Sequence, residues 1–252
     1  MSENNAIMQG GSVAESCVLQ ISDLHKSYGS HPVLEGVSFS IPRGKIVGLL
    51  GPNGCGKSTI MKMISGLLPA DNGSILIDGH LPGLVSKSIV SYLPERTYLN
   101  DWMKVSEVLQ FFSDFYADFD LERAQQMLAD LHLSPNTRLK TMSKGTKEKV
   151  QLILVMSRRA QLYLLDEPIG GVDPAAREYI LNTILKNFDE SSSILITTHL
   201  IQDVEAIFDQ VLFLNQGKIV ITERWTKFVS NTANLSTDSS GRYLNVRKNA
   251  QI

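Results

Sequence analysis

The stretch of sequence that decides the fold is Gly51-Pro-Asn-Gly-Cys-Gly-Lys-Ser-Thr59, which matches the pattern G-x-x-x-x-G-K-[ST] at every fixed position. It follows the apolar run Ile46–Leu50 and precedes a helical pattern that begins near Lys57 and ends near Gly66. Glycines tolerate the positive φ angles that turn backbone N–H groups inward around phosphate oxygens, and the start of a helix adds its dipole. A glycine-rich turn with an incidental lysine would not require a strand before it and a helix after it. Because both are expected here, the sequence predicts a phosphate-binding loop.

Several residues of this loop have an expected role towards the phosphates of a nucleotide. Lys57 supplies a positive charge for the β and γ phosphates, and Ser58 offers its hydroxyl to Mg²⁺. For Cys55 two hypotheses stay open: alkylation of its thiol blocks ATP binding, or it is an inert small residue. The loop alone does not say which kind of P-loop ATPase or GTPase this is. The candidate nucleotide contacts are Gly51, Pro52, Asn53, Gly54, Cys55, Gly56, Lys57, Ser58 and Thr59.

A second motif lies further along the chain, where the apolar run Leu162–Leu165 ends in two acids, Asp166 and Glu167. Asp166 at the end of a strand is expected to hold Mg²⁺ through water. Glu167, one residue later, is expected to polarise the attacking water as a general base. Two solvated acids at an ordinary strand end are the alternative, and the phosphate loop earlier in the chain favours the catalytic interpretation.

The composition is that of an ordinary globular protein of 252 residues, with 43% hydrophobic and 20% charged residues. The net charge of −2 gives no reason to expect a nucleic acid as partner. Two cysteines, Cys17 and Cys55, are too few for a disulfide framework and indicate a reduced, cytoplasmic protein. No apolar run reaches the roughly 18–20 residues of a membrane-spanning helix, and residues 1–15 do not resemble a signal peptide.

The order of the expected elements predicts an α/β fold with a parallel sheet. Apolar residues recur with helical spacing from Val105 to Tyr116, and again from Leu121 to Leu131, where Asp120 is the expected N-cap. Helices between about 102 and 160 therefore form a helical lobe, and further helices are expected at 174–188 and 200–207. Strands are expected at Cys17–Ile21, Val33–Ile41, Lys45–Leu50, Ser74–Ile77, Ile89–Tyr92, 161–165, 193–197 and 210–214.

The chain is expected to divide into three parts. Residues 1–16 are polar and predict a disordered lead, and residues 17–222 contain the folded domain with its helical subdomain at about 96–160. Residues 223–252 are polar and without pattern, which predicts a tail rather than a second domain.

Over roughly residues 18–222 the chain resembles the ATP-binding domain of ABC transporters. Four further stretches carry the resemblance. They are Thr141-Met-Ser143-Lys144-Gly145-Thr146, similar to the signature motif LSGGQ; Ile169-Gly-Gly-Val-Asp173-Pro174, similar to the D-loop; Ile196-Thr-Thr-His199, similar to the switch histidine; and Tyr28, which matches the aromatic residue that stacks on adenine.

This resemblance implies a P-loop NTPase core with a parallel sheet and flanking helices, an N-terminal antiparallel β subdomain and a helical subdomain. It implies that His199 joins Glu167 in catalysis, and that Tyr28 and Asp173 contact the nucleotide. Taken alone, Tyr28 could instead be an ordinary surface or core tyrosine. Asp173 could start the next helix, with Pro174 in its first turn, and both roles can hold together.

Two positions depart from the family pattern. Glu95, after Tyr92-Leu-Pro, stands where the family has a glutamine that helps to hold Mg²⁺. A carboxylate can also bind Mg²⁺, but it brings a second negative charge near the γ-phosphate. In the signature, Lys144 replaces a glycine and Thr146 a glutamine, a version similar to that of exporter-type ABC ATPases.

The resemblance also implies partners. Ser143 and Gly145 would reach the γ-phosphate bound to the opposite subunit of a homodimer or heterodimer. A separate membrane-spanning subunit would press near Glu95 and the segment 96–102, which places the chain on the inner face of the cell membrane. Within that segment, Trp102 could be an interface anchor or a core aromatic.

ATP-driven transport, most simply export, is thus the expected function. Two alternatives stay open: a soluble ABC-type ATPase of an assembly machine, and a low-turnover regulator. Lys57 and Ser143 lie too close in the sequence to enclose the long coiled coils of condensin-type repair ATPases.

Overall fold

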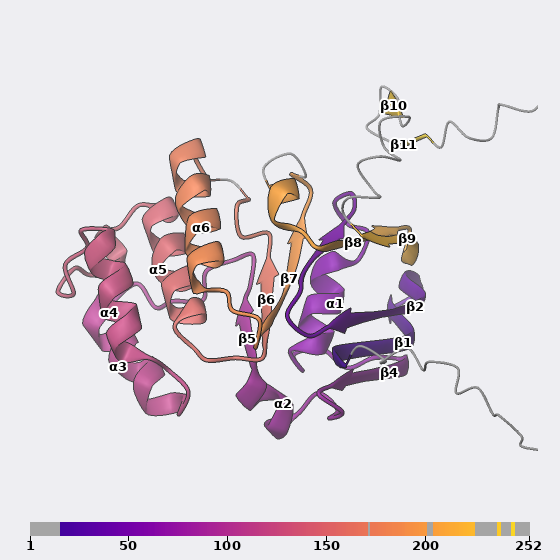
Figure 1. Ribbon diagram of the computed structural model, residues 1–252, viewed down its shortest axis with the longest axis horizontal. Helices are drawn as coiled ribbons and strands as arrows, with labels where there is room; N and C mark the ends of the chain where they lie inside the picture. The colour runs from indigo at the N-terminus through magenta and orange to yellow at the C-terminus, as the bar shows by residue number, and fades with distance from the viewer. Residues whose placement is uncertain (1–15, 171, 201–203, 225–235, 238–242, 245–252) are drawn as a thin grey trace, which may run out of the picture.

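The computed structural model describes residues 16–170, 172–200, 204–224, 236–237 and 243–244. The two larger sheets are arranged around one helix, and the helices between residues 105 and 187 form a lobe on the far side of the largest sheet (Figure 1). The expected disordered lead lies outside the described residues except for Ser16. No helix in the described part of the chain is long and apolar enough to cross a membrane.

The larger sheet has six strands in the order β5-β6-β7-β3-β8-β9. The first five are parallel, as expected for a fold in which strands and helices alternate, whereas β9 pairs with β8 in the antiparallel sense. The strand β9 was not predicted, and it places Glu223 and Arg224 in the sheet rather than in a tail. The bounds are β3 (Ile46–Leu50), β5 (Val90–Leu93), β6 (Leu162–Asp166), β7 (Ser193–Thr198), β8 (Gln210–Asn215) and β9 (Lys218–Arg224).

The smaller sheet is the expected N-terminal antiparallel unit, with the order β2-β1-β4. Its strands β1 (Cys17–Tyr28) and β2 (His31–Pro42) are longer than predicted, and β4 spans Asn72–Ile77. The register of β1 shifts beyond Ile21, where Asp23 adopts a φ of 49°, and this irregularity lets the strand continue past the polar residues that appeared to end it.

The helices follow the predicted periodicity. Asp120 caps its helix as expected, because its side chain accepts a hydrogen bond of 3.0 Å from the backbone N–H of Arg123. Of the predicted helix 200–207, residues 201–203 lie outside the described part, and the last three residues form a 3₁₀ turn, η2 (Glu205–Ile207). The helix α2 was not predicted. The bounds are α1 (Lys57–Ile64), α2 (Leu84–Ile89), α3 (Val105–Phe115), α4 (Leu121–Asp130), η1 (Leu139–Thr141), α5 (Lys144–Met156) and α6 (Pro174–Asn187). A short antiparallel pair, β10 (Ser236–Thr237) and β11 (Tyr243–Leu244), lies in the predicted tail.

Each face of the larger sheet packs into its own hydrophobic core. Side chains such as Val47 and Leu164 point to the face covered by α1 and the antiparallel sheet. Their neighbours in the sequence, such as Ile46 and Leu165, point to the opposite face, which α3, α4, α5 and α6 cover. The strands are therefore buried on both sides, as is typical of parallel sheets that helices cover.

The helical lobe is joined to the sheet by a buried arginine. Arg158 is 3% exposed, and its guanidinium donates hydrogen bonds to the carbonyl oxygens of Val90 (2.7 Å) and Ser88 (3.0 Å). It also forms an ion pair with Asp118 (3.0 Å) and lies 4.0 Å from the ring centre of Tyr116. One side chain thus connects the end of α2 and the start of β5 to the loop between α3 and α4.

We expect Arg158→Ala to lower the free energy of unfolding by about 3–5 kcal/mol, because it leaves carbonyl oxygens and a carboxylate without their buried partner. The neighbouring Arg159→Ala is the matched control: its side chain is 75% exposed, so loss of its pair with Asp120 should cost less than about 1 kcal/mol. Urea unfolding of both variants measures the difference, and equal losses would contradict this role for Arg158.

Candidate functional site

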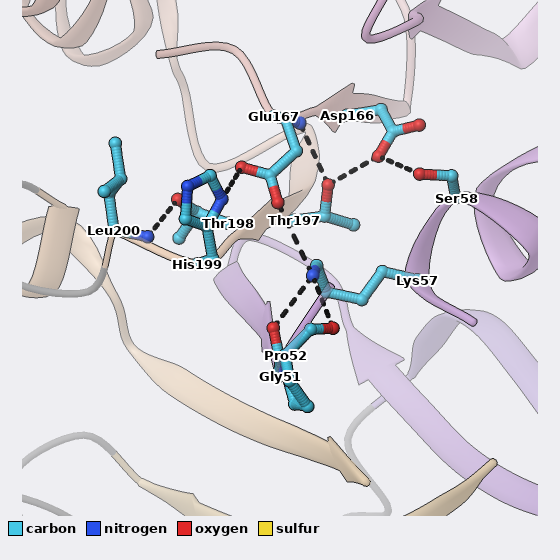
Figure 2. A network of polar contacts seen from close by, with 10 residues as sticks. All are labelled: Gly51, Pro52, Lys57, Ser58, Asp166, Glu167, Thr197, Thr198, His199 and Leu200. Carbon is cyan, nitrogen blue, oxygen red and sulfur yellow. Dashed lines mark hydrogen bonds and ion pairs between the residues drawn. The ribbon is translucent and has the colours of Figure 1, made fainter. Parts of the chain in front are cut away.

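The site lies at one edge of the larger sheet, where three neighbouring parallel strands end. Leu50 at the end of β3 pairs with Thr198 of β7, and Asp166 at the end of β6 pairs with Thr197. The segments that follow these strand ends therefore emerge side by side. Figure 2 shows the result: the phosphate loop, the two acids and His199 meet in one network of polar contacts.

The phosphate loop requires glycine at two of its positions. Gly51 has a φ of 153°, and a Cβ there would collide with the carbonyl oxygen of Leu214. Gly56 has a φ of 112°, and a Cβ there would lie 2.7 Å from Cδ2 of Leu34. The pattern of glycines that was recognised in the sequence is therefore imposed by close packing against β2 and β8 as well as by backbone conformation.

Lys57 is the first residue of α1 and is 6% exposed. Its Nζ donates to the carbonyl oxygens of Gly51 at 2.8 Å and Pro52 at 3.3 Å, and lies 3.5 Å from Oε1 of Glu167 (Figure 2). A buried ammonium group needs such acceptors, and phosphate oxygens can serve in their place. The ammonium group is therefore held beside the phosphate loop, in a position compatible with its predicted role as a positive charge for the β and γ phosphates.

Asp166 is 1% exposed and joins the loop to the strands. Its Oδ1 accepts hydrogen bonds from Thr197 (2.6 Å) and Ser58 (3.1 Å), and its Oδ2 lies 3.5 Å from the hydroxyl of Tyr92. Burial raises the pKa of Asp166, the two hydroxyl donors act against this, and the negative charge of Glu95 adds to the rise. A cation next to this carboxylate would favour its charged form.

The oxygen donors of this site fit Mg²⁺ better than they fit a metal ion whose ligands all come from the protein. Mg²⁺ typically takes one or two protein oxygens and completes its shell with phosphate oxygens and water. The described residues contain no group of three or more His, Cys, Asp or Glu side chains arranged to hold a metal ion. Ser58 and Asp166, whose oxygens lie 3.1 Å apart, match the smaller set that Mg²⁺ needs.

Contacts of both its backbone N–H and its carboxylate hold Glu167 in place. Its φ of 50° lies in the left-handed region, and its N–H donates to the carbonyl oxygen (3.1 Å) and the hydroxyl (2.9 Å) of Thr197. Its Oε2 lies 2.9 Å from Nδ1 of His199. The unusual backbone conformation, held by these bonds, points the carboxylate between His199 and Lys57 (Figure 2).

These residues line an open cavity of about 980 Å³. The lining includes Asn53, Gly54 and residues 56–59 of the phosphate loop, together with Tyr28, Glu95, Glu167 and His199. Tyr28 is 51% exposed at the end of β1, so its ring is free to stack on a planar group in the cavity. Asp166 lies behind this lining and reaches the cavity through Ser58.

Six predicted nucleotide contacts lie outside the lining of the cavity: Gly51, Pro52 and Cys55 of the phosphate loop, and Ser143, Gly145 and Asp173. Ser143 is exposed at the N-cap of α5, where its Oγ accepts a hydrogen bond of 3.2 Å from the N–H of Thr146. Gly145 follows it in the first turn, and Asp173 is exposed immediately before α6. The neighbouring Lys144 does line the cavity. The structure therefore does not bring Ser143, Gly145 and Asp173 together with Lys57 within this one chain.

The sequence did not predict the contributions of Thr197, Tyr92 and Glu148. Thr197 was visible as a hydroxyl residue in the apolar strand that ends at His199, but its bond to Asp166 depends on the pairing of β6 with β7. Glu148 lines the cavity from α5, next to its ion-pair partner Lys144. Nothing in the local sequence places this face of α5 at the cavity.

Comparison with known proteins identifies the family. A family model described as ABC transporter matches residues 34–170, which is more than half of the chain. The chain belongs to the ABC transporter family.

Curated relatives and solved structures agree. The SkfA peptide export ATP-binding protein SkfE of Bacillus subtilis (strain 168) is 34% identical, over 81% of this chain and 87% of that protein. The linearmycin resistance ATP-binding protein LnrL of the same organism is 31% identical, over 81% of this chain and 68% of that protein. A solved ATP-binding subunit of an ABC transporter has a TM-score of 0.77 at 28% identity and covers 86% of this chain and 93% of its own.

Within this ABC domain, Cys55 does not have the accessible position in the cavity that the alkylation hypothesis requires. Its side chain is 7% exposed and packs into the core shared with α1 rather than lining the cavity. Burial raises the pKa of the thiol, although the charge of Lys57 opposes the rise. Because the thiolate is the reactive form, the structure favours the inert small residue.

We expect Cys55 of the folded protein to react with iodoacetamide at pH 8 at least about 100-fold more slowly than in the urea-unfolded chain, because burial both shields the sulfur and disfavours the thiolate. Mass spectrometry of peptides measures both rates. The half-buried Cys17, read in the same digest, is the internal control. Rapid labelling of Cys55 in the folded protein would mean that the loop opens and would restore the original hypothesis.

We expect ATP binding to depend more steeply on Mg²⁺ in the native protein than in Glu95→Gln, because a carboxylate in the lining of the cavity would repel metal-free ATP and would bind the metal when it is present. Two charges about 4 Å apart in water interact by about 1 kcal/mol, so the ratio of Kd values without and with Mg²⁺ should differ about fivefold. Calorimetric titration with and without chelator measures it. Glu122→Gln, on the exposed face of α4, is the control, and equal dependence in the native protein and Glu95→Gln would contradict this role.

Proposed function

We propose that this chain is the ATP-hydrolysing subunit that powers transport, in the direction of export, by a separate membrane-spanning partner. The observation that carries the proposal is the position of Glu167. Its carboxylate lies 2.9 Å from His199 and 3.5 Å from Lys57, at the wall of the cavity that the phosphate loop lines. A base held beside a phosphate-binding cation is the arrangement that hydrolysis of a γ-phosphate requires.

The reaction is the transfer of the γ-phosphoryl group of ATP to water. The water oxygen forms a bond to the γ-phosphorus, the bond from that phosphorus to the bridging oxygen breaks, and ADP and phosphate leave. Glu167 accepts the proton of the water, and His199 holds its carboxylate in position. Lys57 and the N–H groups of the loop stabilise the negative charge of the phosphates. Ser58 and Asp166 would hold Mg²⁺, which would supply further positive charge next to the phosphates.

The proposal includes a second subunit and a membrane partner. Ser143 is exposed and lies outside the cavity of its own chain, so it is available to the nucleotide of a facing subunit, either a second copy or a related chain. Trp102 is 65% exposed, which favours the interface anchor over the core aromatic. Such a partner would hold the chain at the cytoplasmic face of the membrane.

Two relatives support the direction of transport through their names. SkfE is named for the export of a peptide. The lipopolysaccharide export system ATP-binding protein LptB of Escherichia coli (strain K12) is 30% identical over 80% of this chain and 88% of that protein. The exported molecules of these relatives differ, so they indicate export without indicating which substrate this chain serves.

We expect Glu167→Gln to lower ATP turnover at least about 100-fold while ATP binding is retained, because the variant loses the proton acceptor but not the phosphate contacts. With ATP and Mg²⁺ the variant should elute from a sizing column as a dimer. Phosphate release and elution volume are the measurements, and Glu122→Gln should behave like the native chain.

The other outcomes identify the alternatives. If the native chain is inactive alone but active when co-expressed with its membrane subunit, the proposal stands. Inactivity in both preparations would contradict it and would favour the low-turnover regulator. Turnover by a chain that co-purifies with soluble assembly proteins, and with no membrane protein, would favour the assembly machine.

A further inference from the structure

One buried side chain of α5 is polar although every neighbour in its run is apolar. The residues from Val150 to Met156 are all buried, and Gln151, at 2% exposed, is the polar member of this run. A methionine or leucine of similar volume would fill the same space without carrying an amide out of water. Packing therefore gives no reason for glutamine at this position.

The amide of Gln151 uses only part of its hydrogen-bonding capacity. Its Nε2 donates to the carbonyl oxygen of Pro94 over a long distance, 3.4 Å, and its Oε1 has no hydrogen-bond partner among the described residues. A buried acceptor without a donor destabilises a fold. Stability is thus a poor explanation for Gln151, and the contact that it does make is the place to look for its role.

That contact is to the residue that precedes Glu95. Glu95 lines the cavity, and its charge is close enough to raise the pKa of both Asp166 and Tyr92. Pro94 has no N–H of its own, and β5, which leads into this loop, lies at the edge of the sheet, where β6 is its only partner among the strands that the structure describes. The position of Glu95 relative to Asp166 therefore depends on what holds the chain at Pro94.

The helix α5 holds this segment at two points. The hydroxyl of Ser91, in β5, donates to the carbonyl oxygen of Val155 at 2.9 Å, and Gln151, one turn earlier on α5, donates to Pro94. The first contact fixes the strand, and the second reaches the start of the loop. The same helix has Ser143 as its N-cap and lines the cavity with Lys144 and Glu148. A displacement of α5 would therefore act on the residue before Glu95 through Gln151.

We propose that Gln151 is a positioning residue that ties Glu95 to the signature helix α5, and so sets the distance of the Glu95 carboxylate from Asp166 and the Mg²⁺ site. This inference rests on the proposed ATPase function. It predicts that an apolar residue of the same size at position 151 leaves the fold intact, or stabilises it, while it impairs the metal-dependent step.

The test compares Gln151→Met and Gln151→Leu with Leu154→Met, a substitution of similar size at a fully buried apolar position of the same helix. Tm, kcat and the Mg²⁺ concentration for half-maximal turnover are measured for each purified protein. We expect both Gln151 variants to keep or raise the Tm, to need several-fold more Mg²⁺, and to lose roughly tenfold in kcat, since small misplacements of site groups have effects of this order. Leu154→Met should change neither the Mg²⁺ requirement nor kcat.

A double variant decides whether Gln151 acts through Glu95. If it does, Gln151→Met in a Glu95→Ala background should cause no further loss, because the group that it positions is already gone. Equal losses in both backgrounds would overturn the inference, as would a fall in Tm that accompanies the loss of turnover. Native turnover with unchanged Gln151 variants would refute this inference alone, whereas absence of native turnover with the membrane partner present would refute the proposed function.

Discussion

The carboxylate of Asp166 is the interaction on which the rest of the site depends. It ends β6, it accepts hydrogen bonds from Thr197 at the end of β7 and from Ser58 in the first turn of α1, and it is almost completely buried. One charged group thus fixes two neighbouring strand ends and the phosphate-binding helix relative to one another. Such a group is costly to bury, and its hydroxyl donors offset only part of that cost. A bound cation would offset more of the cost of burying this carboxylate. The carboxylate that organises the site is therefore also well suited to bind a metal.

The conformation of Glu167 follows from that arrangement. With Asp166 directed towards α1, the next residue must turn out of the strand at once, and it does so with a left-handed φ of 50°. Both oxygens of Thr197 accept a hydrogen bond from the N–H of Glu167, while its hydroxyl also donates to Asp166. Thr197 therefore positions both acids. The roles of the two carboxylates differ because their surroundings differ: one is held by hydroxyl groups, the other between a histidine and an ammonium group.

Much of this was predictable because the decisive features are local. The phosphate loop, the acids at the end of β6 and His199 at the end of β7 can each be recognised from a short stretch and its strand context, and parallel strands bring such ends together. Other features depend on pairings between distant segments. The sequence did not reveal that β9 adds an antiparallel strand at the edge of the sheet, or that Thr197 donates a hydrogen bond to Asp166. It also did not reveal that Cys55 points into the core. Each of these requires knowing which elements pack together.

The departure at Glu95 is better understood through the structure than through the sequence. Considered alone, a carboxylate in place of a glutamine appears to weaken a nucleotide site by adding charge. Glu95, however, lies near Asp166, whose pKa is raised mainly by burial, and it lines the same cavity as Arg96 and Lys144. Two acids in such a place repel each other until a divalent cation lies between them, so we expect the substitution to strengthen the dependence of ATP binding on metal rather than to remove it. On the inference proposed for Gln151, the distance between these two acids would govern metal binding, and the contacts of Ser91 and Gln151 between β5, the loop after it and α5 would set that distance on one side.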